Sequence, residues 1–267
     1  MLIHPNFDPV AVSIFGLKVH WYGLMYVAAF LSCYLLWVYR VKKYDHLQGS
    51  IWKAETISDL IFYGALGAVV GGRIGYILFY KLGDYLANPT AIFKVWEGGM
   101  SFHGGLLGVI VALALFARRH KLKLLEIADF VAPVAPIGLF WGRIGNFINQ
   151  ELWGKTTDLP WGMVFSNGGP LPRHPSMLYE ALLEGILLLI VLWLLARKQR
   201  PLGMIAGVFM VGYAIARSVV ELVRVPDEHL NYLLFDWVTM GQVLSLPMVL
   251  CGLYLIWRSR RYSQYYS

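Results

Sequence analysis

The stretch IADFVAPVAPIGLFWGRIGNFINQELWG, residues 127–154, decides what kind of fold this chain adopts. Its part 127–149 is largely apolar and is long enough to cross a bilayer, which takes about 20 helical residues. Yet the stretch ends on an arginine, two asparagines, a glutamine and a glutamate. An arginine near the bilayer centre costs between about 2.5 and 17 kcal/mol, so it normally faces a polar partner or a cavity. The stretch therefore predicts a transmembrane helix that carries a binding site at its outer end.

The composition of the whole chain agrees with a membrane protein. Its 267 residues are 58% hydrophobic and only 15% charged, whereas soluble domains carry about 25% charged residues. Seven apolar runs approach or exceed the length of a membrane span. They lie near residues 16–39, 57–80, 100–117, 127–149, 177–196, 203–223 and 238–257. We expect one all-α polytopic membrane domain over residues 1–267 with about seven transmembrane helices.

The basic residues predict the orientation of this domain. They cluster after the odd-numbered runs, at Arg40, Lys42 and Lys43; Arg118, Arg119, Lys121 and Lys123; Arg197, Lys198 and Arg200; and Arg258, Arg260 and Arg261. Because such clusters mark the cytoplasmic loops, the N-terminus is expected outside and the C-terminus in the cytoplasm. The net charge of +7 then reflects orientation and requires no nucleic-acid partner. Of the two long outer loops, 81–99 and 150–175, we expect the second to form a small external subdomain.

The first residues and the two cysteines add little chemistry. The N-terminal sequence MLIHPNFDP lacks the basic region and cleavage site of a removable signal peptide. Cys33 and Cys251 lie deep in apolar runs, where free cysteines act as small packing residues. No disulfide framework and no zinc-binding spacing is present. We expect neither a metal nor a cofactor.

Five polar residues on five different runs reach a common depth. A rise of 1.5 Å per residue places each of them about 21–27 Å above the inner end of its run. In a hydrocarbon core about 30 Å thick, that is the outer third. The five are Tyr22, Arg73, His103, Arg143 and Arg217. They predict a polar cavity near the outer leaflet.

The arginines also have structural interpretations. Arg143 shares a helix face with Asn146 and Gln150, and Glu151 is near enough in sequence to neutralise it. We favour a binding site, because a buried ion pair is by itself weak evidence for stability. Arg217 shares a helix face with Glu221 and Arg224. In the alternative interpretation, Glu221 and Arg224 form only a salt bridge at the outer membrane interface.

Three other features remain open in the same way. Arg73 either binds a ligand or extends to the membrane interface. His103 is either an interface residue or part of the site, and its flanking glycines favour the site because they allow close approach. Glu180 and Glu184 are four residues apart on the fifth run, where hydrogen bonding between helices is the simpler interpretation.

Three arginines and a histidine at this depth predict an anion site that opens toward lipid. Arginine binds phosphate through a bidentate, charge-assisted fork, so a phospholipid phosphate is the expected occupant. Two function classes fit this site, an enzyme acting on phospholipid and a lipid or anion transporter. A transporter needs access from both sides and usually has broken helices at the bilayer midplane. Because the polar residues stay in the outer third, the enzyme is favoured.

Several sequence blocks resemble one family. GRIGNFINQELWG at 142–154 resembles the signature of the bacterial prolipoprotein diacylglyceryl transferases. The family's other blocks are similar to HWYGLMY at 20–26, GGRIGY at 71–76, SFHGG at 101–105 and RHPS at 173–176, in the same order. The resemblance covers nearly the whole chain.

The resemblance implies an activity and its partners. The family transfers a diacylglyceryl group from phosphatidylglycerol to the lipobox cysteine of a prolipoprotein signal peptide. The products are a thioether and glycerol 1-phosphate, and the reaction occurs at the outer face of the bacterial cytoplasmic (inner) membrane. Membrane lipid is a partner, and nucleic acid is not.

The resemblance also implies roles for individual residues. The expected catalytic residues are His103, Arg143, Arg217 and Tyr22. The expected substrate-binding residues are Arg143, Asn146, Glu151, Gly154, Arg73, Glu221 and Arg224. We further expect the loop at 150–175 to receive the cysteine region of the signal peptide while the hydrophobic part of that peptide lies against the spans.

Overall fold

A computed structural model describes residues 2–48, 50–94, 98–225 and 239–263. The chain divides into two compact units, one formed by Met1–Trp37 with Ala128–Ser267 and the other by Val38–Ile127. They are called the first unit and the second unit below, and each is described by itself. The single domain over residues 1–267 stays a prediction.

The described residues contain six helices that are long and apolar enough to cross a membrane. They are α1 (Trp21–Lys43), α2 (Ala54–Tyr80), α4 (Phe102–Arg119), the continuous span Ser176–Leu195, α9 (Met204–Glu221) and α10 (Met240–Ser263). A bent pair, α5 (Leu124–Val131) and α6 (Ala135–Ile148), forms a seventh span if the two helices are counted together. The prediction of an all-α, multi-pass membrane protein is confirmed.

The fourth predicted span is not one helix. The axes of α5 and α6 differ by 56° across the break at residues 132–134. Pro133 lies in the break and Pro136 in the first turn of α6. Proline has no backbone N–H and its ring clashes with the preceding turn, so these residues end one helix and start another. The continuous helix expected over 127–149 was wrong in this respect.

The first span also begins later than expected, at Trp21 and not near residue 16. The residues before it form a hairpin of β2 (Val10–Ile14) and β3 (Leu17–His20), in which Val12 pairs with Val19. Its two turn residues, Phe15 and Gly16, have φ angles of 49° and 83°. Two-residue hairpin turns favour such positive φ values. The first residues of the apolar run near 16–39 thus belong to the turn and to β3, and not to the membrane span.

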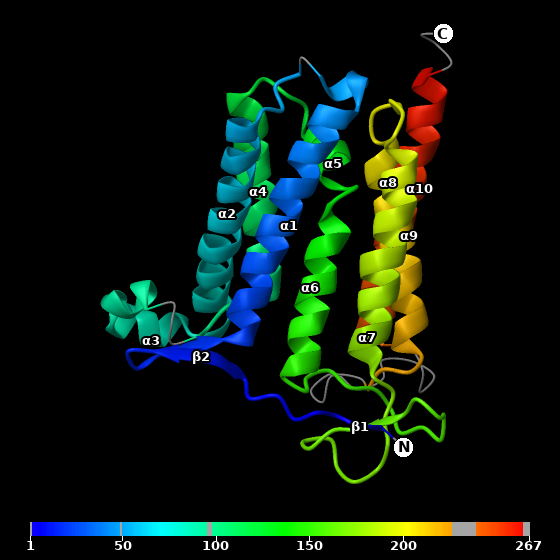
Figure 1. Cartoon of the computed structure of the whole chain (residues 1–267). Coiled ribbons are helices and arrows are strands. Elements are labelled where there is room, and N and C mark those ends of the chain that lie inside the picture. Colours follow the sequence, from blue (N-terminus) through cyan, green and yellow to red (C-terminus); the bar gives the residue numbers. More distant parts are fainter. Residues whose placement is uncertain (1, 49, 95–97, 226–238, 264–267) are drawn as a thin grey trace. The chain divides into compact units, whose positions relative to one another are not determined.

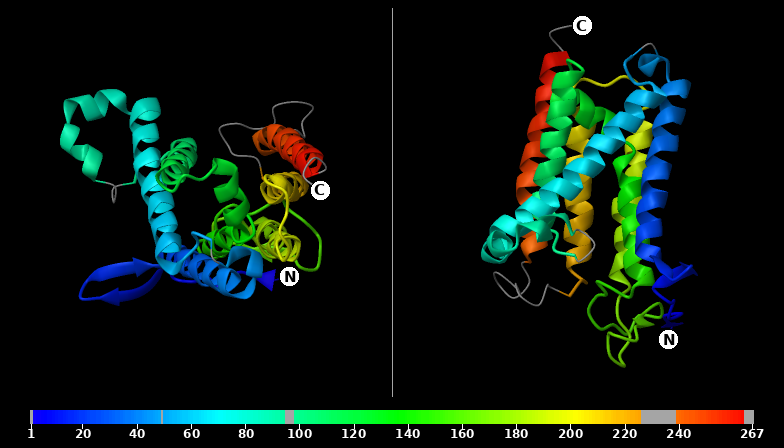
Figure 2. Two further views of the ribbon diagram at one scale, coloured as in Figure 1. Left: turned by 90° about the horizontal axis from the view of Figure 1, so that it is seen from above. Right: turned by 90° about the vertical axis from the view of Figure 1, so that its left-hand side faces the viewer.

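In the second unit, α2 and α4 run side by side (Figures 1 and 2). Glycines let their backbones meet: a Cβ on Gly75 would lie 2.7 Å from Cα of Gly104, and one on Gly67 would lie 2.5 Å from the carbonyl oxygen of Gly108. Small residues spaced four apart permit such close helix packing in membranes. The 3₁₀ helix η1 (Asp45–Leu47) precedes α2, whereas α3 (Leu82–Ala87) and the 3₁₀ helix η2 (Pro89–Phe93) follow it.

In the first unit, the span Ser176–Leu195 changes its helical type. It consists of α7 (Ser176–Glu180), the π-helical segment η4 (Ala181–Leu187) and α8 (Leu188–Leu195). π-Helical turns are rare and often occur at functional sites. Gly185 in this segment lies against α6, where an added Cβ would be 2.7 Å from Cβ of Phe140.

Helix α9 is fixed at its first turn by a side chain from α5. Asp129 accepts hydrogen bonds from the backbone N–H groups of Gly203 at 2.6 Å and Ala206 at 2.8 Å. A carboxylate here satisfies N–H groups that have no partner within the helix, and it opposes the positive end of the helix dipole. Asp129 therefore sets the position of the helix that carries Arg217 and Glu221.

The loop at 150–175 is tied to the N-terminal residues of the same unit. Strand β1 (Leu2–Ile3) pairs in parallel with β4 (Met163–Val164). Next to it, the buried His4 contacts the carbonyl oxygen of Phe147 through Nε2 at 2.9 Å. Burial lowers the pKa of His4, and its Nδ1 accepts the Asn6 N–H, so the neutral ring suits both contacts.

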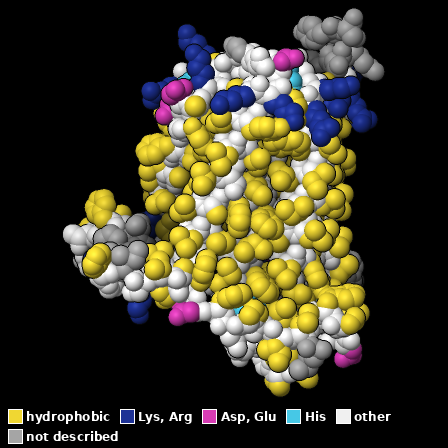
Figure 3. All heavy atoms as spheres, viewed as in Figure 1, with side chains coloured by type: hydrophobic (Ala, Val, Ile, Leu, Met, Phe, Trp, Pro, Cys, Tyr) yellow, Lys and Arg dark blue, Asp and Glu magenta, His cyan; other side chains and the backbone are white. Residues whose placement is uncertain are grey.

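The surface of the helices follows the sequence pattern. In each unit, hydrophobic side chains cover the sides of the helices, and Lys and Arg side chains gather at helix ends (Figure 3). The last turns of α1, α4 and α10 all carry basic residues. This distribution suits a protein surrounded by lipid.

Candidate active site

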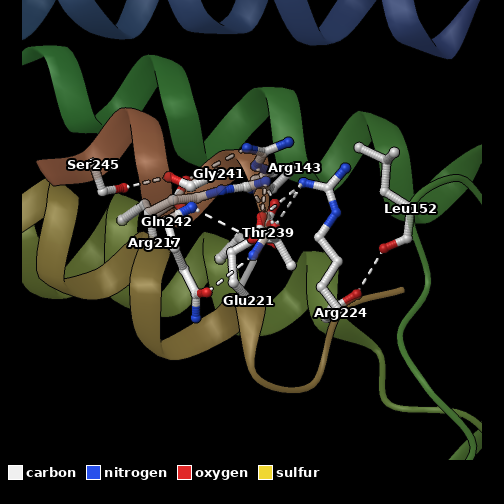
Figure 4. Close-up of polar contacts among 12 residues, drawn as sticks. Arg143, Leu152, Arg217, Glu221, Arg224, Thr239, Gly241, Gln242 and Ser245 are labelled. Atoms are coloured by element: carbon white, nitrogen blue, oxygen red, sulfur yellow. Dashed lines mark hydrogen bonds and ion pairs between the residues drawn. The ribbon is translucent and has the colours of Figure 1, made fainter. Parts of the chain in front are cut away.

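A cluster of buried and half-buried charged side chains occupies the first unit. Helix α6 supplies Arg143, the end of α7 supplies Glu180 and segment η4 supplies Glu184. Helix α9 and the residues after it supply three more: Arg217, Glu221 and Arg224. Figure 4 shows the three arginine side chains turned toward one region, with Glu221 between Arg217 and Arg224.

Glu180 is the centre of this cluster. Its Oε2 lies 2.6 Å from Nε of Arg143, and its Oε1 lies 2.8 Å from a terminal nitrogen of Arg217 and 3.6 Å from one of Arg224. The Glu180 side chain has no exposed surface. A buried carboxylate is stable only when it is paired, and here one carboxylate holds three guanidinium groups.

Two more glutamates complete the ion pairs. Glu184 Oε2 is 3.5 Å from Arg143, and Glu221 pairs with Arg217 and, at 3.8 Å, with Arg224. The salt bridge between Glu221 and Arg224 that the sequence left open is thus present. The cluster is therefore built from alternating charges, and not from arginines alone.

The signature residues at the end of α6 add a fourth carboxylate. Asn146 donates to Glu151 at 3.0 Å, Asn149 donates to the other oxygen of Glu151 at 3.2 Å, and Asn146 Oδ1 accepts from Arg143 at 3.4 Å. Glu151 thus contacts asparagine amides, and Arg143 pairs with glutamates of the neighbouring span. The contact from Arg143 to Asn146 is long, and Arg143 is the most exposed of the three arginines at 19%. It is the arginine best placed to offer donors to a ligand.

Gly154 ends the signature at a point where three backbone segments meet. Its N–H donates to the carbonyl of His174 at 2.8 Å, and it forms a β-bridge with Arg224. A Cβ on Gly154 would lie 2.5 Å from the carbonyl oxygen of Val223. Only glycine fits there, because a backbone oxygen cannot move aside as a flexible side chain can.

The loop that follows is held by polar contacts of its own. Arg173 donates to the carbonyl groups of Gly168 at 2.6 Å and Gly154 at 3.3 Å, and its guanidinium lies 4.0 Å from the ring centre of Trp153. Burial, and then the nearby Lys155, lowers the pKa of His174. These contacts fix the loop against the end of the signature.

Tyr22 lies against the signature helix from α1. Its ring is the nearest neighbour of Gly145, where an added Cβ would lie 3.0 Å from the ring carbon Cδ2. It also makes an edge contact with Tyr26. Gly145 thereby allows an aromatic ring to lie beside the helix turn that carries Arg143 and Asn146.

Gly241 positions Glu221 from the first turn of α10. That turn begins with reciprocal hydrogen bonds between Thr239 and Gln242, the pattern of a capping box. A Cβ on Gly241 would lie 2.6 Å from Oε1 of Glu221, the atom that pairs with Arg217. The absence of a side chain at this position therefore leaves room for the ion pair (Figure 4).

Changing Gly241→Ala is expected to lower turnover about tenfold, because the new methyl group displaces Glu221 from Arg217 and an ion pair in partly buried surroundings is worth more than 1 kcal/mol. Activity of the purified variant measures the loss. Adding Glu221→Asp in the same chain should recover part of it, since the shorter carboxylate withdraws from the methyl group. If the fraction of activity left in the double variant equals the product of the fractions left in the two single variants, Gly241 does not act through Glu221.

Two predicted site residues, Arg73 and His103, belong to the second unit. All five N–H donors of Arg73 bind backbone carbonyl groups of the loop after α2, at 2.5–3.2 Å. The acceptors are Ala91, Ile92, Lys94, Gly98 and Gly99. Arg73 is 5% exposed, so it neither extends to the interface nor has donors left for a ligand in this structure. Its contacts favour a role in holding the outer loop.

Changing Arg73→Lys is expected to release the segment at 81–99. A lysine ammonium has three donors and no planar fork, so at least two of the five carbonyl groups lose their partner. Limited proteolysis should then cut this segment several times faster than in the unchanged protein, whereas Lys81→Arg, at an exposed residue of the same loop, should not change the rate. Equal cleavage of all three proteins would contradict this role.

His103 lies in the first turn of α4 and is exposed. Its ring contacts Phe102 edge-on, with ring centres 5.6 Å apart. The preceding Ser101 caps the helix by accepting the N–H of Gly104 at 3.3 Å. The imidazole is thus accessible from outside the unit.

Sequence reasoning missed the central part of the cluster. For Glu180 and Glu184 the sequence only favoured hydrogen bonding between helices, whereas they are the counter-ions of Arg143 and Arg217. Their depth on an otherwise apolar span was the signal, since a buried carboxylate needs a cation. Among the described residues, no group of three or more His, Cys, Asp or Glu side chains is arranged to hold a metal ion.

Comparison with known proteins identifies the family. A family model described as prolipoprotein diacylglyceryl transferase matches residues 9–258. The chain belongs to this family. The prolipoprotein diacylglyceryl transferase match includes every residue of the cluster described above.

Curated relatives of the same family are similar along nearly their whole length. A phosphatidylglycerol–prolipoprotein diacylglyceryl transferase of Pseudomonas aeruginosa is 56% identical over 262 residues, 98% of this chain and 97% of the relative. One from Nitratidesulfovibrio vulgaris is 55% identical over 256 residues, 96% of each chain. One from Legionella pneumophila is 52% identical over 260 residues, 97% of this chain and all of the relative.

Proposed function

We propose that this protein transfers the diacylglyceryl group of phosphatidylglycerol to the thiol of the lipobox cysteine in prolipoproteins. The names of its full-length relatives carry this proposal, since they describe the same reaction at 52–56% identity. The buried cluster of arginines and glutamates supports it, because the reaction releases a phosphate ester.

The reaction needs few protein groups. The cysteine loses its proton, and the thiolate attacks the glycerol carbon that carries the phosphate. A sulfur–carbon bond forms while the carbon–oxygen bond breaks. The bonding electrons leave with glycerol 1-phosphate, so negative charge grows on the phosphate in the transition state.

Arg143 and Arg217 are proposed to stabilise this leaving phosphate. Preorganised donors stabilise developing charge without reorganisation during the reaction. Glu180 holds both guanidinium groups in fixed orientations, at 2.6 and 2.8 Å. Asn146 and Glu151 extend the polar contacts of Arg143 toward the loop.

His103 is proposed to take the thiol proton, because histidine is the side chain that most often serves as a general base and this imidazole is exposed. Tyr22, Gly154, Glu221 and Arg224 are proposed to shape the site through the contacts described above. For Arg73, the saturated donors support a role in positioning the outer loop.

The same proposal places the protein in the bacterial inner membrane with its site toward the outer leaflet. The basic last turns of α1, α4 and α10 support this orientation, because positive residues stay on the cytoplasmic side.

A single assay tests the function. The purified protein is incubated with phosphatidylglycerol vesicles and a prolipoprotein, and the mass of the prolipoprotein is followed. We expect a gain of one diacylglyceryl group that is absent when the lipobox cysteine is changed to alanine. Arg143→Ala should abolish the gain, whereas Arg197→Ala, at an exposed residue after α8, should not.

No mass gain from folded, lipid-bound protein would contradict the transferase proposal. The alternative, a phospholipid or anion transporter that uses the same arginines, would then be tested by lipid flux between the two leaflets.

A further inference from the structure

The guanidinium group of Arg143 makes one short contact and two long ones. Its Nε lies 2.6 Å from Oε2 of Glu180. Its two terminal nitrogens lie farther from their partners, at 3.4 Å from Oδ1 of Asn146 and 3.5 Å from Oε2 of Glu184. Hydrogen bonds between a guanidinium and a carboxylate are usually about 2.7–2.9 Å long. The terminal nitrogens are therefore the donors of Arg143 that its present partners hold least tightly.

Glu184 is the carboxylate of the cluster with the fewest partners. Its side chain has no exposed surface, and its Oε1 is buried without a hydrogen-bond partner among the described residues. Oε2 of Glu180 also lacks a hydrogen bond, but it lies 2.6 Å from Arg143. Glu221 pairs with two arginines, and the exposed Glu151 accepts from two asparagine amides. Because a buried charge needs partners, Glu184 is the acid whose ionised form is stabilised least.

The surroundings of Glu184 offer it little further support. Among the described residues, only Arg143 lies within ion-pair distance of its carboxylate. Four titratable groups interact with it electrostatically, and they come from three elements packed against η4. They are Arg143 of α6, Glu180 of α7, and Arg217 and Tyr213 of α9.

The cluster has no excess of positive charge with which to bind a phosphate. Its three arginines are matched by three paired carboxylates, those of Glu180, Glu184 and Glu221. The phosphate of a phospholipid adds one more negative charge. Like charges at short distance disfavour ionisation of the acids among them. Binding of the phosphate therefore favours protonation of one carboxylate.

We propose that Glu184 is the displaceable counter-ion of Arg143 and takes up a proton when a phospholipid phosphate binds. The phosphate takes the two terminal nitrogens of Arg143 as a bidentate fork, whereas Glu180 keeps Nε. Glu184 then loses its ion pair while it is buried, and it becomes a neutral acid with a proton from the surrounding water. The inference rests on the proposed function and adds a positioning residue that links lipid binding to proton uptake.

A fixed structural counter-ion is the other interpretation of Glu184. In that case the side chain stays ionised and keeps its contact with Arg143 whether or not lipid is bound. The two interpretations differ in the number of protons that the protein binds together with the lipid. They therefore differ in how the affinity for lipid changes with pH.

Proton uptake on lipid binding tests the proposal. The purified full chain, freed of lipid in a neutral detergent, receives phosphatidylglycerol without prolipoprotein, so that no transfer follows. A pH-indicator dye in weakly buffered solution at pH 8 counts the protons, and native mass spectrometry counts the bound lipid. Because the phosphodiester of this lipid stays ionised at pH 8, the protons counted belong to the protein. Diacylglycerol, which lacks the phosphate, is the control ligand.

The expected result is uptake of about one proton for each bound phosphatidylglycerol, and none with diacylglycerol. Glu184→Gln keeps the shape of the side chain but binds no proton, so its uptake should fall below about a fifth of that value. Glu151→Gln and the exposed Asp158→Asn should keep the uptake. Lipid binding without proton uptake, or an uptake that Glu184→Gln retains or Glu151→Gln removes, would overturn the proposal.

Infrared difference spectroscopy of the unchanged protein gives a second readout that does not depend on a variant. Addition of phosphatidylglycerol should produce the carbonyl band of a protonated carboxylic acid. The band should shift when the protein contains ¹³C-labelled glutamate, which separates glutamate from aspartate. Lipid binding without such a band would overturn the proposal.

The pH dependence of lipid binding gives a third readout. Uptake of one proton weakens binding about tenfold for each pH unit over which Glu184 is ionised in the free protein. We expect the dissociation constant of the unchanged protein for phosphatidylglycerol to rise about tenfold between pH 7 and pH 9, and that of Glu184→Gln less than about twofold. Equal pH profiles would contradict the role of Glu184.

The transfer assay described above is run on the same preparations. Transfer by the unchanged protein without proton uptake refutes only the role of Glu184. Absence of transfer from lipid-bound, unchanged protein refutes the proposed function itself.

Discussion

Changing Glu180→Gln is expected to lower kcat/KM about a hundredfold and to destabilise the protein by about 3 kcal/mol. The change leaves the shape of the side chain but removes the one anion that contacts Arg143, Arg217 and Arg224. Breaking a buried ion pair from one side costs about 3–5 kcal/mol, because a charge stays buried without its partner. Turnover of phosphatidylglycerol and the midpoint of thermal unfolding measure the two effects.

Asp158→Asn is the control for this change, since it also converts a carboxylate to an amide but at an exposed residue of the 150–175 loop. It should leave the unfolding midpoint unchanged. If Glu180→Gln kept more than a third of the activity, Glu180 would not be what orients the arginines.

Changing Gly154→Ala is expected to abolish activity and to cost about 3 kcal/mol, as overpacking at a rigid contact does. The new methyl group would lie 2.5 Å from the Val223 carbonyl oxygen and 2.8 Å from Cβ of His174. Relief requires the signature, the block at 173–176 and the end of α9 to separate. That movement displaces Arg224 from Glu180 and Glu221.

Gly138→Ala is the matched control. Gly138 lies on α6, five residues before Arg143, and an added Cβ would meet no atom within 4 Å. Activity and unfolding midpoint should be close to those of the unchanged protein, and alanine even favours the helix by roughly 0.5–1 kcal/mol. Normal activity of Gly154→Ala would show that these three segments tolerate separation.

The spans themselves were predictable from the sequence because a bilayer imposes a length and an apolar composition on each of them. Local backbone chemistry was harder to read. The run near 16–39 begins with a hairpin turn residue and the strand Leu17–His20, and the run 127–149 contains a helix break at Pro133. In both places a short-range backbone preference overrides a hydrophobicity signal that averages over many residues.

The candidate site was predictable in part. Depth along each span indicated Arg143 and Arg217, because height follows from residue count. The depth of Glu180 and Glu184 indicated that each needs a cation. Which arginines they pair with depends on how the helices are rotated and which helices are neighbours, and residue count gives neither. Arg73 illustrates the same limit: its depth matches the other arginines, yet its partners are carbonyl groups of a loop about 20 residues further along the chain.

The glutamates that surround Arg143, Arg217 and Arg224 affect how the binding of an anionic lipid depends on salt. A basic patch in water collects mobile ions, releases them when a phosphate arrives, and loses affinity as salt is added. Here the counter-ions are side chains of the same chain, and they are buried. An arriving phosphate sets no dissolved ions free. The protein would therefore hold an anionic lipid with much the same strength in dilute and in salty surroundings.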